Sequence, residues 1–200
     1  MDYVVRKARK GDNLNIARTI AYSFEKTFSV FTKDMERMAK VFENGVAVDR
    51  FYVAEHNEEI IGIVACGDCT GRALGTTKDE CKKYLGLFRG QMAFRVIRSE
   101  LMLPHNYPAT TGYIDVIGVL QQARGKGVAS ELLKELVKNN PQYNEFVLDV
   151  ESVNTSAIKI YANFGFVEFK HVPFTKIFKR SRIFMKYTLP GPMAMPCQFK

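Results

Sequence analysis

A short glycine-containing stretch, Gln122 to Gly127, constrains the fold more than any other feature of the chain. An apolar segment that can form a strand, Tyr113 to Leu120, precedes it, and a segment with helical spacing, Val128 to Lys138, follows it. In a strand–turn–helix unit, the backbone N–H groups of the turn and the positive end of the helix dipole point to one place. Glycine lets a ligand approach the backbone closely, and the side chains of Arg124 and Lys126 add positive charge. The stretch therefore predicts a binding site for an anion such as a diphosphate.

The spacing of these glycines differs from that of the common nucleotide-binding loops. A Walker A loop reads G-x-x-x-x-G-K-S/T, and no such string occurs in the chain. A dinucleotide-binding loop would need a third glycine where Ser130 stands. The stretch instead reads Q/R-x-x-G-x-G/A, which resembles motif A of the GNAT superfamily of N-acetyltransferases. Taken alone, this loose pattern also fits an ordinary strand-to-helix turn.

A second segment, Asn154 to Phe166, strengthens the resemblance. It reads N-x-x-A-x-x-x-Y-x-x-x-G-F, which resembles motif B of the same superfamily at every named position. The residues alone indicate an amphipathic helix, because Asn154 can cap it, apolar side chains recur at helical spacing and Gly165 can end it. The two motifs stand in the expected order, so the chain resembles the GNAT superfamily, most closely from about Tyr113 to Val172.

The remaining segments fit this superfamily by the order of their elements. Strands are predicted at residues 3–6, 51–55, 60–66, 113–120, 145–150, 166–172 and 182–188. Helices are predicted to start near residues 11 and 34 and to cover 77–87, 91–101, 128–138 and 155–164. The resemblance implies a mixed α/β, or α+β, fold of three layers, with a central, mostly antiparallel sheet flanked by helices. We expect one acetyltransferase domain over residues 1–188 and an irregular tail over 189–200.

Composition sets the broad class of protein. Of the 200 residues, 46% are hydrophobic and 25% are charged, which is typical of a globular domain with its own core. No stretch approaches the roughly 18 apolar residues of a membrane span. The first residues also lack the basic start and apolar run of a signal peptide, so we expect a cytoplasmic protein without a membrane partner.

The net charge of +8 fits an anionic partner, whether nucleic acid, a membrane surface or a polyanionic small molecule. Coenzyme A carries several phosphate charges and would account for part of the excess. A basic cluster lies between two predicted strands, so we interpret it as a solvated hairpin and expect no nucleic-acid partner; its members are Lys176, Lys179, Arg180 and Arg182.

Two of the four cysteines, Cys66 and Cys69, have C-x-x-C spacing. A structural zinc site would need a second such pair or histidines at ligand spacing, and neither occurs. A redox motif should open a helix, whereas this pair ends a predicted strand. Reduced structural thiols are therefore expected, and no metal site.

The resemblance implies direct transfer of an acetyl group from acetyl-CoA to a primary amine within a ternary complex. It implies that backbone groups of Ile117 and Val119 pair with the pantetheine arm and that the Val119 N–H stabilises the oxyanion. Asn154 would bind the pantetheine or neighbouring backbone, with a helix cap as the alternative or additional role. The cofactor-binding residues implied in this way are Ile117, Gly118, Val119, Gln122, Arg124, Gly125, Lys126, Gly127, Val128, Ala129, Asn154 and Tyr161.

Tyr161 matches the general acid of the superfamily, since a phenol is a proton donor at neutral pH and can protonate a thiolate. Packing in the core is the alternative role for this side chain. At the position of the general base, the sequence departs from the histone-type members of the superfamily, because Tyr113 stands where they have a glutamate. Asp115 lies two residues further on the same strand face and is our candidate base, with an ion-paired structural carboxylate as the alternative. Glu151 is the reserve candidate, and a water chain is the third option.

Other functions stay open on the sequence alone. The missing glutamate suggests a second hypothesis, a sensor module that binds CoA without turnover. The positive charge alone suggests a third, a nucleic-acid-binding protein, which strong salt-dependent retention on DNA would support. The acceptor amine cannot be read from the sequence, and a homodimer stays open because the proline-rich tail can reach a neighbouring subunit.

Overall fold

The computed structural model describes residues 1–173 and 181–189. One seven-stranded sheet runs through it in the order β1-β2-β3-β4-β5-β7-β6. Only the β4–β5 pair is parallel, so the sheet is mixed and mostly antiparallel, as predicted. The strands are β1 (Val4–Lys7), β2 (Phe51–His56), β3 (Glu59–Gly67), β4 (Thr111–Val119), β5 (Glu145–Glu151), β6 (Val167–Val172) and β7 (Arg182–Thr188).

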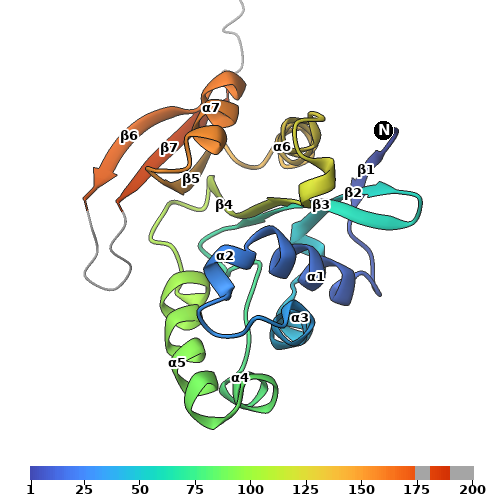
Figure 1. The fold of residues 1–200 in the computed structure, drawn as a ribbon. Helices are drawn as coiled ribbons and strands as arrows, with labels where there is room; N and C mark the ends of the chain where they lie inside the picture. The colour runs from blue at the N-terminus through green and yellow to red at the C-terminus, as the bar shows by residue number, and fades with distance from the viewer. Residues whose placement is uncertain (174–180, 190–200) are drawn as a thin grey trace, which may run out of the picture.

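Helices cover both faces of this sheet, which gives the three layers predicted for the chain (Figure 1). Helices α6 and α7 lie over one face, and α1 to α5 lie on the other side. The helices are α1 (Asn13–Ser23), α2 (Glu25–Phe28), α3 (Met35–Phe42), α4 (Lys78–Leu85), α5 (Leu87–Ile97), α6 (Val128–Lys138) and α7 (Thr155–Phe164). Short 3₁₀ turns are formed by Glu43–Gly45, Val48–Arg50 and Gln121–Ala123, and a π turn by Arg98–Met102.

Each face of the sheet has its own hydrophobic core. The core on the side of α1, here the α1-side core, includes Ile16 and Phe42. The core on the side of α6, the α6-side core, includes Leu132 and Phe146. Both cores consist of hydrophobic side chains. Removal of their apolar surface from water is the main favourable term that holds the helices on the sheet.

Most element boundaries agree with the sequence prediction. Helix α6 and strand β7 match it residue for residue, and Asp34 caps α3 by accepting a hydrogen bond from the Arg37 N–H. The β2–β3 hairpin turns through Asn57 and Glu58, whose positive φ angles suit a two-residue turn. Helix α2 was not predicted, and α5 begins several residues earlier than expected. Residues 174–180, with most of the basic cluster, and the tail from residue 190 lie outside the described residues.

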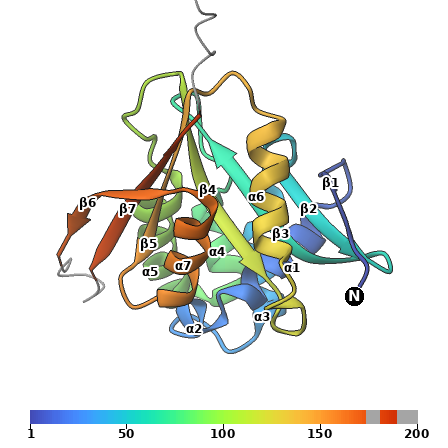
Figure 2. The same cartoon turned by 90° about the horizontal axis from the view of Figure 1, so that it is seen from above.

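Strand β4 separates from β5 partway along its length, as Figure 2 shows. The two strands pair only from Thr111 to Tyr113. Just beyond, Ala65 of β3 pairs with Val116 while Cys66 pairs with Ile114, so Asp115 is the extra residue of a β-bulge. A bulge bends the strand and increases its twist, which accounts for the divergence. Among the described residues, β4 beyond Tyr113 has a strand partner on the β3 side alone.

We predict that Leu132→Ala lowers the free energy of unfolding by about 2–5 kcal/mol, because the side chain is fully buried in the α6-side core. Leu87→Ala is the matched control, since Leu87 is 70% exposed, and its change should stay within about 0.5 kcal/mol. Urea unfolding followed by circular dichroism measures both values. Equal losses in the two variants would contradict this account of the core.

Candidate functional site

The predicted anion-binding stretch forms the turn between β4 and α6. Gly125 and Gly127 have φ angles of 75° and 79°, a left-handed conformation that favours glycine. The first hydrogen bond of α6 runs from the Glu131 N–H to the Gly127 carbonyl at 3.1 Å. The amides of the first helical turn, which include Val128 and Ala129, therefore precede the helical ladder. A methyl group built on Gly125 would meet no atom within 4 Å, so the turn is open to a ligand.

The two cationic side chains of this turn, Arg124 and Lys126, make different contacts. The Arg124 guanidinium donates to the Val119 carbonyl at 3.1 Å and to the Ser23 carbonyl at 3.3 Å, so it ties the turn to β4 and to the end of α1. Lys126 is exposed, as is Gln122 at the start of the turn. Lys126 thus places its positive charge at the exposed side of the turn, whereas Arg124 supports the shape of the turn.

The unpaired half of β4 leads directly into this turn and carries Ile117, Gly118 and Val119. A Cβ on Gly118 would lie 3.0 Å from the hydroxyl oxygen of Ser23. That oxygen is buried without a hydrogen-bond partner in the described part of the chain, which is unusual for a hydroxyl. The sequence prediction missed Ser23, because only the packing of α1 brings it here.

Helix α7 supplies the two residues predicted from the second motif. Asn154 accepts a hydrogen bond from the Ala157 N–H at 3.2 Å, so it caps the helix as expected. Tyr161 is 7% exposed and packs in the α6-side core, with its ring 6.0 Å from that of Phe166. Burial raises the pKa of the Tyr161 phenol, and the charge of Asp149 raises it further. The phenol therefore keeps its proton at neutral pH, and it also contributes to the core.

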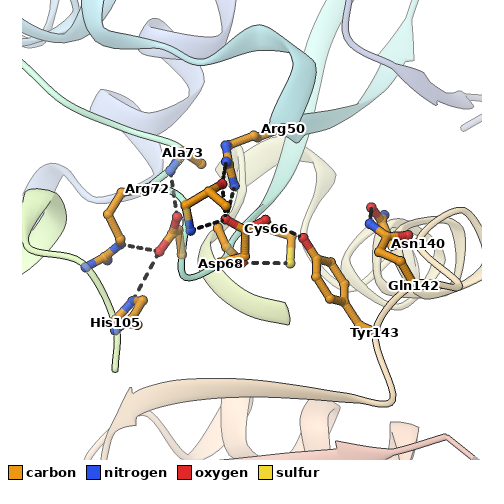
Figure 3. Close-up of polar contacts among 12 residues, drawn as sticks. Arg50, Cys66, Asp68, Arg72, Ala73, His105, Asn140, Gln142 and Tyr143 are labelled. Carbon is orange, nitrogen blue, oxygen red and sulfur yellow. Dashed lines mark hydrogen bonds and ion pairs between the residues drawn. The ribbon is translucent and has the colours of Figure 1, made fainter. Parts of the chain in front are cut away.

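The candidate base Asp115 is held by Arg72, Ala73 and His105, which are labelled in Figure 3 around the carboxylate that they contact. Its Oδ1 lies 2.5 Å from Arg72 Nε, its Oδ2 accepts from the Ala73 N–H at 2.7 Å, and the His105 Nε2 lies 3.4 Å away. The Asp115 side chain is 2% exposed. These contacts favour the structural alternative for Asp115, a buried ion-paired carboxylate that holds the bulge in place.

A second carboxylate, Asp149 of β5, lies close to the point where the strands separate. The Tyr113 hydroxyl donates to its Oδ1, and Arg182 Nη1 lies 3.1 Å from its Oδ2. Arg182 also pairs with Glu100, so it is not part of a solvated basic cluster, contrary to the sequence prediction. Sequence reasoning missed Asp149, although a carboxylate on an apolar central strand was the criterion applied to Asp115.

The comparison with known families decides the class of protein. A family model described as the Acetyltransferase (GNAT) family matches residues 18–166. The chain belongs to the GNAT family. This membership covers the turn, the unpaired half of β4 and helix α7, and it confirms the resemblance expected from the two motifs.

Solved structures share the fold of this GNAT chain. An N-acetyltransferase from Staphylococcus aureus Mu50 has 18% identity and a TM-score of 0.63, over 92% of this chain and 100% of that one. YncA from Salmonella typhimurium, solved with its cofactor acetyl-CoA, has 18% identity and a TM-score of 0.58, over 98% of each chain. The ribosomal-protein-S18-alanine N-acetyltransferase from Escherichia coli has 12% identity and a TM-score of 0.57, over 98% and 99%. At these identities the likeness shows the fold alone, and no curated protein matches the chain in sequence.

The two cysteines with C-x-x-C spacing differ in exposure. Cys66 is buried and Cys69 exposed, and both thiols are free. Burial raises the pKa of the Cys66 thiol, which disfavours a reactive thiolate. Over residues 1–173 and 181–189, no group of three or more His, Cys, Asp or Glu side chains is arranged to hold a metal ion. No helix in the same ranges is long and apolar enough to cross a bilayer.

A polar cluster beside Cys66 lines a hollow of about 280 Å³ next to β3 (Figure 3). Burial acts to raise the pKa of Asp68, but hydrogen bonds from Thr70 and Tyr143 and the charge of Arg50 outweigh it and lower the pKa to about 2. Arg50 lies 3.2 Å from Asp68, and Tyr143 donates to the same carboxylate at 2.8 Å. These contacts fix Asp68 beside the end of β3 in the GNAT fold.

We predict that Asp115→Asn lowers the free energy of unfolding of the GNAT chain by about 3–5 kcal/mol, because it leaves the buried Arg72 guanidinium without its counter-charge. Glu36→Gln is the matched control. It removes a carboxylate from an ion pair with Arg18 whose side chains are 44% and 47% exposed, and such pairs contribute about 1 kcal/mol or less. Chemical denaturation at pH 7 compares the two, and an Asp115→Asn loss as small as the control would refute the structural role.

Proposed function

We propose that this GNAT chain is an N-acetyltransferase that transfers the acetyl group of acetyl-CoA to a primary amine by direct transfer in a ternary complex. One observation carries the proposal. The unpaired half of β4 ends in an open, glycine-containing turn at the start of α6, so a strand edge and an anion site are continuous. That combination suits a ligand with an amide-rich arm and a diphosphate, which is the chemistry of coenzyme A.

The residues of the turn would hold the diphosphate, with amides from Gly125 to Ala129 as donors and Lys126 as the main cation. Gln122 opens the turn, and Arg124 keeps its geometry. The pantetheine arm would lie along Ile117, Gly118 and Val119, where its amides add to the sheet in place of β5. Asn154 would face the same arm from the start of α7. The solved relative that contains acetyl-CoA supports the choice of cofactor.

The transfer itself needs a neutral amine, a stabilised oxyanion and a protonated leaving group. The Val119 N–H is the proposed donor to the oxyanion. Tyr161 is the proposed donor to the departing sulfur, because its phenol carries a proton at neutral pH. The buried setting of Tyr161 also excludes water, so the acyl group meets the amine rather than solvent.

The second candidate function is a sensor module that binds CoA without turnover. Tyr113 in place of the glutamate of histone-type members favours it, as does the full set of partners around Asp115. Release of free thiol from acetyl-CoA in a panel of amines separates the two functions. Steady turnover with any amine rules out the sensor.

We predict that acetyl-CoA binds the protein in a calorimetric titration. Lys126→Glu should raise the dissociation constant about tenfold, a loss of about 1.4 kcal/mol of binding free energy, because the new carboxylate repels the diphosphate. Lys138→Glu makes the same charge change at the far end of α6 and should leave the dissociation constant nearly unchanged. Absence of binding by the wild-type protein at high micromolar concentration would exclude both candidate functions.

We predict that Tyr161→Phe lowers kcat about 100-fold, because the departing thiolate loses its proton donor. The acetyl-CoA dissociation constant should stay within about twofold, since the ring remains in the core. Tyr52→Phe is the matched control, because Tyr52 is equally buried in the α6-side core. An unchanged kcat in Tyr161→Phe would assign Tyr161 to packing alone.

A further inference from the structure

The carboxylate of Asp149 occupies a position for which the proposed function so far has no residue, the proton acceptor for the incoming amine. We propose that Asp149, held in place by Tyr113 and Arg182, binds the acceptor amine and receives its proton. The inference rests on the proposed function and deepens it by naming the group that serves the acceptor.

The position of Asp149 along β5 supports this role. The last residue of β5 that pairs with β4 is Val147, and Asp149 is two residues beyond it. Asp149 therefore stands where β4 and β5 begin to separate, level with the bulge that follows Tyr113. A group that enters between the strands at this point reaches Asp149 without displacing any ladder hydrogen bond between β4 and β5.

Asp149 and Tyr161 lie on different faces of the sheet. Phe146, Leu148 and Val150 point into the α6-side core, so Asp149 points to the opposite side by the alternation of a strand. Tyr161 belongs to the α6-side core. The proposed proton donor and the proposed proton acceptor thus lie on opposite faces of the sheet, at the same opening. The charge of Asp149 contributes to the raised pKa of Tyr161, which supports their closeness.

The Asp149 carboxylate can accept further hydrogen bonds. Asp149 has one hydrogen bond from Tyr113 to Oδ1 and one ion-pair contact from Arg182 to Oδ2, and its side chain is 24% exposed. A carboxylate has about four lone-pair sites, so Asp149 can accept further bonds. Asp115 has three partners and is 2% exposed. Of the two carboxylates, Asp149 is the one that an amine can reach.

The neutral amine nitrogen donates its lone pair to the thioester carbon and forms the C–N bond, while the π electrons of the C=O bond move to oxygen and an N–H of the amine is hydrogen-bonded to Asp149. The N–H bond then breaks, its electrons stay on nitrogen, and the proton moves to the carboxylate. The oxyanion re-forms the C=O bond as the C–S bond breaks with its electrons on sulfur, and the Tyr161 proton joins the thiolate. Water restores both side chains to their starting protonation states.

His105 is the competing acceptor. Its ring stacks on that of Tyr113 with 3.4 Å between centroids, and its Nε2 is buried without a hydrogen bond in the described residues. The Nε2 faces Asp115 rather than Asp149, so the ring belongs to the ion-pair cluster of the bulge.

The test uses the full-length protein with acetyl-CoA and the fastest acceptor from a panel of spermidine, lysine, ethanolamine and a peptide that begins with alanine. Asp149→Asn keeps an oxygen for the Tyr113 hydroxyl but removes the base, and kcat should fall at least about 100-fold. Its acetyl-CoA dissociation constant, measured by calorimetry, should stay within about twofold, since the proposed cofactor contacts are elsewhere. Glu145→Gln is the matched control on the same face of β5, where Glu145 accepts from Thr111, and it should keep wild-type turnover.

Two further measurements separate a proton acceptor from a structural residue. Added formate should restore part of the turnover of Asp149→Ala, because a free carboxylate can occupy the vacated position, and no rescue is expected in His105→Ala. A crystal structure with a bisubstrate compound that joins an amine to acetyl-CoA should place the amine nitrogen about 2.6–3.2 Å from an Asp149 oxygen. This second measurement does not depend on the folding of any variant.

The outcomes are distinct. Wild-type turnover in Asp149→Asn, or a bisubstrate nitrogen directed at His105 or Asp115, would overturn this inference while acetyl-CoA binding and turnover leave the proposed function intact. Failure of the wild-type protein to bind acetyl-CoA would remove the proposed function itself.

Discussion

The buried ion pair between Arg72 and Asp115 is the contact on which the architecture of the site depends. Asp115 is the extra residue of the bulge in β4, and its carboxylate is fixed by Arg72 and by the Ala73 N–H. A charge buried to this extent is tolerated only with such partners, so the bulge cannot slide along the strand without exposing an uncompensated charge. Since β4 leaves β5 immediately before the bulge, this pair fixes where the sheet opens.

The opening explains why one sheet can serve two reactants from opposite sides. On the α6 face, Tyr161 belongs to the same core as Val128, the first residue of α6 after the glycine turn. On the other face, Tyr113 and Asp149 are joined by a hydrogen bond, and Arg182 extends this contact to Glu100. The separated strands leave the backbone edge of β4 between these groups. The groups proposed to serve acetyl-CoA and those proposed to serve the amine therefore lie on opposite faces of the sheet. They come together only where β4 and β5 separate.

Local signals were sufficient to predict much of this arrangement. The glycine turn, helix α6, the Asn154 cap and the strand β7 depend on residues close together in sequence, and the structure has them as expected. The alternation rule correctly placed Asp115 on the face of Tyr113. The same rule could not reveal that the bulge reverses the alternation beyond Asp115. As a result, Val116 enters the α1-side core and Ile117 packs against the α6-side core. Asp149 and Ser23 were missed, and Arg182 was wrongly assigned to a solvated cluster, because their roles arise only from contacts distant in sequence.

The two hydrogen bonds of the Arg124 guanidinium have a consequence for how ligands communicate. Arg124 belongs by its backbone to the turn, while its side chain holds the carbonyl of Ser23 at the end of α1. A ligand that shifts the turn must also strain or release that end of α1, and a ligand that moves α1 must act back on the turn. The affinities for two ligands, one at each place, are then coupled by the same factor in both directions, as thermodynamic linkage requires.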